Sequence, residues 1–224
     1  MNKRVHSFFY LSLITIIFLF IGCKSETNKN STFKTESNKK QNKIIQDEPP
    51  KTNKPNFRGI PFGTKREKVL DWEDGDPFIK NDGRVAYRGE TAGLSAIRVY
   101  YFTADSNKFV TADYIFREQH SNRNLYINDY KNVQSILEDI YGEPTSGRGE
   151  IWLDDLYRDE PSQYGFAVSL GDLRYRYEWK TDSLKVIHIL RGDNYKITHT
   201  ASYGYIPLLK VFKKEIQEKA KSDF

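Results

Sequence analysis

Two histidines are the residues of this chain whose spacing could hold a ligand. His188 and His199 lie on either side of the Gly192-Asp193 dipeptide, in segments of strand-like composition. A hairpin centred on that dipeptide pairs His188 with Ile197 and His199 with Val186, which places both imidazoles diagonally on one sheet face. A metal site there would need a third ligand, and the sequence indicates none. The apolar residues around them favour the alternative, a pair of core histidines.

A stripe of aromatic residues is the second candidate for binding. Tyr175, Tyr177 and Trp179 alternate along a predicted strand at 173–179 and therefore share one face. Tyr and Trp rings on an open sheet face could stack on a glycan or anchor a protein partner. In a chain with one cysteine, and hence no internal disulfide, the same rings could instead form the covered face of the sheet. The covered face is the favoured interpretation.

The acidic residues do not form a motif for metal binding or catalysis. Carboxylates gather at 71–82 and at 154–160, but the D-x-D-x-D-G order of a calcium loop is absent from both. The sequence also lacks a glycine-rich phosphate loop, a G-x-S-x-G nucleophile elbow and an H-E-x-x-H zinc motif. Arg191-Gly192-Asp193 spells an adhesion tripeptide, but it falls where the hairpin needs a turn. We therefore expect a protein that is not an enzyme and uses no cofactor.

The elements that position these residues follow from hydrophobic periodicity and turn signals. Helices are predicted from Thr64, with Glu67 as its capping-box partner, at 129–141, and from Pro207 to about residue 221. Strands are predicted at 84–88, 94–102, 109–117, 150–153, 166–170, 173–179, 184–191 and 195–203. Gly171-Asp172 is expected to form a primed turn. The predicted fold class is α+β, an antiparallel sheet with helices packed on one face.

An internal match suggests that this domain arose by duplication. Residues 69–77 align with residues 136–144, with an apolar pair, a glycine, an acid and a proline at the same offsets, 67 positions apart. Each copy ends a predicted helix and is followed by strand-like segments. We therefore predict tandem helix-plus-strands repeats, at about 57–127 and 128–203, with a C-terminal helix at about 207–221.

The N-terminal segment is apolar from Phe8 to Ile21, follows Lys3 and Arg4, and stops just before Cys23, the only cysteine. A basic start, a short apolar run and a small residue at its end are typical of a secretory signal peptide. The run has 14 residues, whereas a membrane-spanning helix needs ~20. We expect residues 1–22 to be the signal peptide.

Charge separates the next segment from the domain. Residues 23–56 hold eight Lys and four acidic residues, a net charge of +4, and few apolar residues. This composition predicts a disordered tether. Residues 57–224 hold 25 basic and 26 acidic residues, a net charge of −1. A nearly neutral domain argues against nucleic acid as a partner.

Two stretches resemble known families. Phe20-Ile-Gly-Cys23 resembles the lipobox of bacterial lipoproteins, which implies cleavage before Cys23 and a diacylglycerol on its sulfur. Ile60, Gly63-Thr64, Val69 and Gly75-Asp-Pro77 look like the SmpA/BamE-type lipoprotein module, which is similar in layout to the repeats of β-lactamase inhibitory protein. The chain as a whole also resembles lipoproteins of Bacteroidota.

These resemblances imply a non-enzymatic module of the cell envelope, anchored to a membrane by lipid, that works by contact with another envelope protein. Lys24 after the cysteine favours the outer membrane of a Gram-negative bacterium. The alternatives are an inhibitor or immunity protein against a secreted hydrolase, and a glycan-binding or metal-binding domain.

Overall fold

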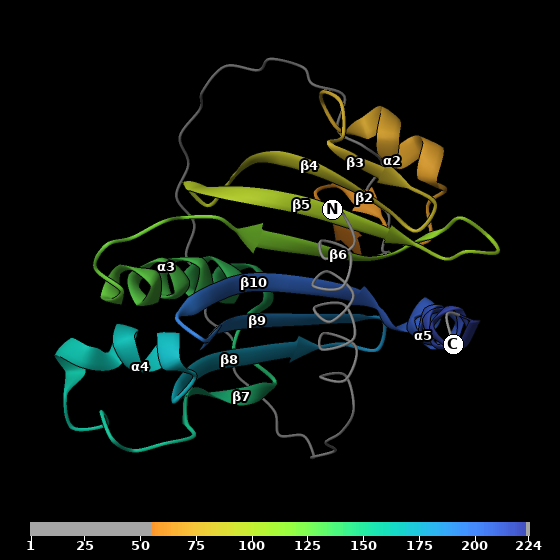
Figure 1. Cartoon of the computed structure of the whole chain (residues 1–224). Coiled ribbons are helices and arrows are strands. Elements are labelled where there is room, and N and C mark those ends of the chain that lie inside the picture. The colour runs from red at the N-terminus through yellow and green to blue at the C-terminus, as the bar shows by residue number, and fades with distance from the viewer. Residues whose placement is uncertain (1–54, 223–224) are drawn as a thin grey trace, which may run out of the picture. The chain divides into compact units, whose positions relative to one another are not determined.

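Eight strands form one antiparallel sheet, in the order β3-β4-β5-β6-β10-β9-β8-β7 (Figure 1). The computed structural model describes residues 55–222. The strands of this sheet are β3 (Ile79–Asn81), β4 (Arg84–Thr91), β5 (Leu94–Phe102), β6 (Phe109–Phe116), β7 (Ser146–Trp152), β8 (Leu173–Lys180), β9 (Leu184–Asp193) and β10 (Lys196–Tyr205). A separate two-stranded pair is formed by β1 (Asn56–Phe57) and β2 (Ile60–Pro61).

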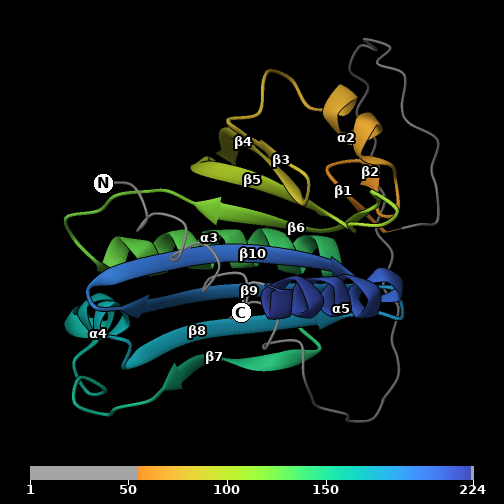
Figure 2. The same cartoon turned by 45° about the vertical axis from the view of Figure 1, so that its right-hand side comes forward.

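The helices pack against this sheet, which confirms the predicted α+β class. They are α2 (Arg66–Trp72), α3 (Asn124–Tyr141), α4 (Tyr164–Leu170) and α5 (Ile206–Ser222), with a 3₁₀ turn η1 (Pro161–Gln163) before α4. α2, α3 and α4 cover the face that carries Tyr100, Tyr203 and Leu190. α5 lies across the end of the sheet and contacts its other face, where Phe212 packs on Tyr101 (Figure 2).

The order of elements is the same in both halves of the sheet. Each half is a helix followed by four antiparallel strands, and the last strands of the halves, β6 and β10, pair at the centre. The halves differ most in the connection between their first two strands: β3 and β4 are joined by the tight turn Asp82-Gly83, whereas β7 and β8 are joined by residues 153–172, which include α4. The predicted duplication of the sequence stays a prediction.

Aromatic side chains fill the core between the sheet and its covering helices. Phe57, on the short strand β1, contacts the rings of Tyr100, Phe109, Tyr114 and Tyr203, with centroids 4.7 to 6.5 Å apart. A second cluster, around Tyr130 and Leu190, lies under α3 and α4. In these clusters the aromatic residues that make up 14% of the chain supply buried apolar area in the absence of an internal disulfide.

Three of the local predictions near α2 and α4 are wrong. Residues 166–170 lie in α4 and not in a strand, because Gly165 packs on the backbone of Arg123 and Ala167 and Val168 are buried. Gly171, with φ of 99°, is the left-handed C-cap of that helix rather than part of a primed turn. The capping box is absent too: the Thr64 hydroxyl donates to the carbonyl of Pro61, and α2 begins at Arg66.

The predicted register of the last hairpin is also wrong. The turn lies at Asn194-Tyr195, both with positive φ of 47° and 64°, so His188 pairs with Ala201 and not with Ile197. The centre of the turn has moved by two residues, an even number, and therefore every side chain keeps its predicted face. His188 and His199 still lie diagonally on one face, as predicted.

Candidate functional site

The two histidines contact each other at the centre of the covered face. Their Nε2 atoms lie 2.8 Å apart, and their exposed fractions are 0% for His188 and 5% for His199. The Nδ1 atom of His188 lies 2.9 Å from Gln134 Oε1 on α3. Since an amide oxygen only accepts, His188 donates from Nδ1 and accepts at Nε2 from His199.

This hydrogen-bonded chain extends to the surface. Gln134 donates from Nε2 to Glu138 Oε1 over 2.8 Å, so four side chains form one directional series, His199 to His188 to Gln134 to Glu138. Tyr130 stacks on His188 with centroids 4.0 Å apart, and Phe116 stacks on His199 at 4.1 Å. The series pairs polar groups that would otherwise be buried without partners.

Burial keeps both imidazoles neutral. Desolvation lowers the pKa of His199 to about 3, and desolvation and then the neighbouring His199 lower the pKa of His188 well below its ordinary value. His188 uses both ring nitrogens in hydrogen bonds, which leaves it no free lone pair for a metal. Within residues 55–222, no group of three or more His, Cys, Asp or Glu side chains is arranged to hold a metal ion.

The aromatic stripe on β8 lies beneath α3. Tyr175 and Trp179 are 2% and 3% exposed, and Trp179 donates from Nε1 to the carbonyl of Gly142 over 2.7 Å. These two rings are therefore part of the core, which the sequence analysis favoured over an open platform. Tyr177, the third residue of the stripe, is half-buried and reaches a pocket at the edge of the sheet.

This pocket lies between α3 and the strand pair β7–β8 and measures roughly 400 Å³. Its lining combines tyrosine rings with charged and amide side chains, from Tyr130, Lys131, Gln134, Ser135, Glu138, Gly149, Glu150, Tyr175 and Tyr177. Sequence reasoning identified only Tyr175 and Tyr177. The spacing of Tyr130, Gln134 and Glu138 marks one helix face, but no sequence signal places that face over β7 and β8.

A second candidate is an exposed surface at the end of the molecule that carries α4. We call it the α4 surface and define it by Leu153, Leu156, Tyr157, Phe166 and Tyr195. Leu153, Leu156 and Tyr195 are 62%, 70% and 59% exposed. Phe166 connects Tyr157 and Tyr195, with ring centroids 5.5 and 6.3 Å away. Leu153, Leu156 and Tyr157 belong to the β7–β8 connection, Phe166 to α4, and Tyr195 to the β9–β10 turn that hydrogen-bonds to α4.

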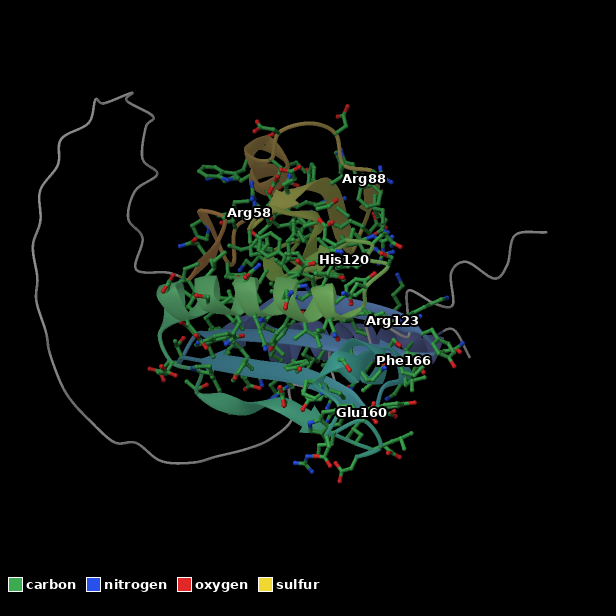
Figure 3. All side chains as sticks on the ribbon, turned by 90° about the vertical axis from the view of Figure 1, so that its left-hand side faces the viewer. Arg58, Arg88, His120, Arg123, Glu160 and Phe166 are labelled. Carbon is green, nitrogen blue, oxygen red and sulfur yellow. The ribbon has the colours of Figure 1, made fainter. Side chains whose placement is uncertain are left out.

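Charged residues surround the α4 surface. Figure 3 looks onto this end and shows Phe166 between Arg123, whose guanidinium lies 5.5 Å from the ring centroid, and Glu160. The carboxylates predicted as a solvated loop, Asp154, Asp155, Asp159 and Glu160, are all exposed. Asp154 accepts from the backbone N–H of Leu156, and Asp155 pairs with Arg158 at 3.0 Å. These carboxylates form an acidic rim.

One carboxylate of the other acidic segment is buried. Glu73 directly follows α2, and its side chain accepts from Arg58 at 3.0 Å, from Arg98 at 2.9 Å and from the Tyr100 hydroxyl. The sequence offered no sign of this, because Glu73 lies among exposed acids. The cluster fixes the end of α2 to β5 and leaves the carboxylate no free oxygen for a ligand.

The remaining described histidine, His120, belongs to the connection that leads into α3. Its Nε2 atom lies 2.5 Å from Asp129 Oδ2, and its ring packs edge-on against Tyr126. The Tyr126 hydroxyl also accepts from the backbone N–H of His120. These contacts fasten the connection to the first turns of α3.

Cys23, the predicted lipidation site, and the predicted signal peptide lie outside the described residues. Among the helices that the structure describes, none is both long enough and apolar enough to cross a bilayer. Comparison of the chain with protein-family models, with curated proteins and with solved structures finds no match.

Proposed function

We propose that this chain is a lipoprotein of the cell envelope, anchored through lipid on Cys23 to the outer membrane of a Gram-negative bacterium. Its α+β domain is a non-enzymatic module that binds another envelope protein. The N-terminal sequence supports the anchor, since an apolar run of 14 residues precedes the only cysteine. Residues 23–56 would then tether the domain to the membrane.

The main support for protein binding is the α4 surface. Of the nine large apolar side chains that are exposed between residues 55 and 222, Leu153, Leu156 and Tyr195 are the three most exposed except for Ile140. Each would contribute ~1.5–3 kcal/mol if fully buried by a partner. Exposed apolar side chains gathered on one surface and rimmed by charges are typical of a protein-binding site.

The position of the α4 surface in the fold supports the same function. Most of it is built on the β7–β8 connection, which contains α4 where the matching β3–β4 connection is a tight turn. The connection is held in place from both sides, since Asn124 of α3 contacts Ser162 and Gly165, and Ser169 accepts from the backbone of Tyr195. A loop held in this way on a rigid sheet is a common way to present binding residues.

The acidic rim indicates the charge of the partner. Asp154, Asp159 and Glu160 are exposed in the same connection as the two leucines, and Arg158 is engaged with Asp155. A complementary partner surface would place basic side chains around an apolar centre. We therefore expect the association to weaken as salt rises.

The test is a pull-down of tagged full-length protein from crosslinked cells. The double change Leu153→Ser and Leu156→Ser should weaken recovery of the partner at least about tenfold. Ile140→Ser is the matched control, because Ile140 has the same 62% exposure as Leu153 but lies on α3. Equal recovery with all variants would contradict binding at the α4 surface.

A parallel sample tests whether Cys23 is lipidated and distinguishes an adaptor from an inhibitor or immunity protein. Metabolic labelling with an alkyne fatty acid should label the natural chain and not Cys23→Ala. A partner recovered only with the lipidated form indicates a membrane-tethered adaptor. A secreted hydrolase that binds both forms equally, and loses activity on binding, would indicate an inhibitor or immunity protein instead.

A further inference from the structure

We propose that the pocket between α3 and β7–β8 binds an organic cation, a primary ammonium or a guanidinium group. This site lies on other residues than the α4 surface, and the proposal stands independently of the protein-binding function. It rests on two carboxylates that line one pocket from different elements, Glu138 on α3 and Glu150 on β7. A volume of roughly 400 Å³ lies in the range of small-molecule sites and leaves room for an amino-acid side chain.

Both carboxylates are held by buried groups of the protein. Gln134, 7% exposed, donates to Glu138 Oε1 over 2.8 Å, and its own orientation is fixed because its oxygen accepts from His188. Tyr175, 2% exposed, donates from its hydroxyl to Glu150 Oε1 over 3.3 Å. Each carboxylate thus has one oxygen engaged with the interior, and its other oxygen can accept from a ligand. Carboxylates held in place in this way lose less conformational entropy when a ligand binds.

The backbone of β7 is shaped around the same pocket. The pairing of β7 with β8 is interrupted by a bulge between Gly147 and Gly149, both with positive φ. A Cβ added at Gly149 would lie 2.6 Å from the hydroxyl oxygen of Tyr177. The absence of a side chain at this position therefore allows the phenol of Tyr177 to lie at the wall of the pocket.

The lining favours a cation over a sugar or an anion. A sugar would need an open aromatic face, but Tyr130 and Tyr175 are 1% and 2% exposed, and the phenol of Tyr177 lies against Gly149. An anion would meet the carboxylates of Glu138 and Glu150, and Lys131 is the one basic residue among the described side chains of the lining. A cation meets both carboxylates. The positive charge of Lys131 repels a cation, so removing that charge should strengthen cation binding.

Ligand-observed NMR titration of the full chain in detergent micelles tests the proposal. The probes are Nα-acetyl-lysine methylamide, its uncharged counterpart Nα-acetyl-norleucine methylamide, and n-butylamine. We expect the lysine probe to bind at least about tenfold more tightly than the norleucine probe. Binding of n-butylamine as tight as that of the lysine probe would indicate a free amine as the natural ligand. Tighter binding of the lysine probe would indicate a side chain of a protein or peptide.

Substitutions locate the binding. Glu138→Gln and Glu150→Gln should each weaken the lysine probe about fivefold or more, and Lys131→Gln should strengthen it. Asp139→Asn is the matched control, since Asp139 is an acidic neighbour on α3 that does not line the pocket. The proposal is overturned if the lysine and norleucine probes bind equally, if neither binds, or if both Glu→Gln variants bind like the natural chain.

Discussion

The buried histidine pair should make the stability of the domain depend on pH in a direction that the structure determines. Both imidazoles are neutral in the fold, because burial holds the pKa of His199 at about 3 and that of His188 well below the ordinary 6.5. Below pH 6.5 the unfolded chain binds protons at these residues and the folded chain does not. The free energy of unfolding therefore falls as the pH falls from 6.5 toward the folded pKa values.

The size of the effect follows from the same values. At pH 5 the unfolded histidines are 1.5 units below their pKa of 6.5, which corresponds to about 2 kcal/mol for each residue and about 4 kcal/mol for the pair. Asp113 acts in the opposite sense, because burial raises its pKa to about 6 from 3.8. As the pH falls, the folded form gains a proton before the unfolded form does, which offsets about 1 kcal/mol of the loss at pH 5.

Urea-induced unfolding of the full chain at pH 7.5, 6.0 and 5.0, followed by tryptophan fluorescence, measures this dependence. The double variant His188→Asn and His199→Asn is less stable at pH 7.5 because it loses packing, yet it should lose about 4 kcal/mol less than the natural chain between pH 7.5 and 5.0. His120→Asn controls for removal of a histidine outside the pair. Equal losses for the natural chain and the double variant would refute the reasoning.

Two further predictions concern stability, and chemical denaturation checks both. Glu73→Gln should lower the free energy of unfolding by about 3–5 kcal/mol, because the buried guanidinium of Arg98 loses its carboxylate. The control Glu67→Gln, at an exposed position, should lower it by less than about 1 kcal/mol. Similar losses for the two variants would argue against the ion cluster. Gly192→Ala should cost at least about 2 kcal/mol, because its Cβ would lie 2.1 Å from the carbonyl oxygen of Val168; Gly83→Ala, with open space around it, should be nearly neutral.

Much of the sheet could be predicted from local signals. The strands of the β5–β6 and β9–β10 hairpins and the start of α5 near Pro207 follow from alternation and turn residues. The shared face of His188 and His199 was also predictable. Side chains alternate between the faces of a strand, and the turn lies two residues from its predicted position, so neither side chain changes face. The burial of Tyr175 and Trp179 agrees with the favoured interpretation of the aromatic stripe.

The features that were predicted wrongly, or not predicted, depend on contacts between segments far apart in the sequence. Residues 166–170 have an apolar composition that suits a strand, and their helix is set by packing of Gly165 on the start of α3. The burial of Glu73 depends on Arg98, which is brought to it by β5. The pocket depends on how α3 lies over β7 and β8, and the α4 surface depends on the β9–β10 turn lying beside α4.

Photo-crosslinking in living cells from position 156 tests the central claim most directly. Leu156 is 70% exposed on the α4 surface, and Val211, 47% exposed on α5, gives the reference position. Binding through the α4 surface predicts one discrete crosslinked product from position 156, absent from position 211 and lost when Leu153→Ser is added. No product from position 156, or the same product from both positions, would contradict the claim.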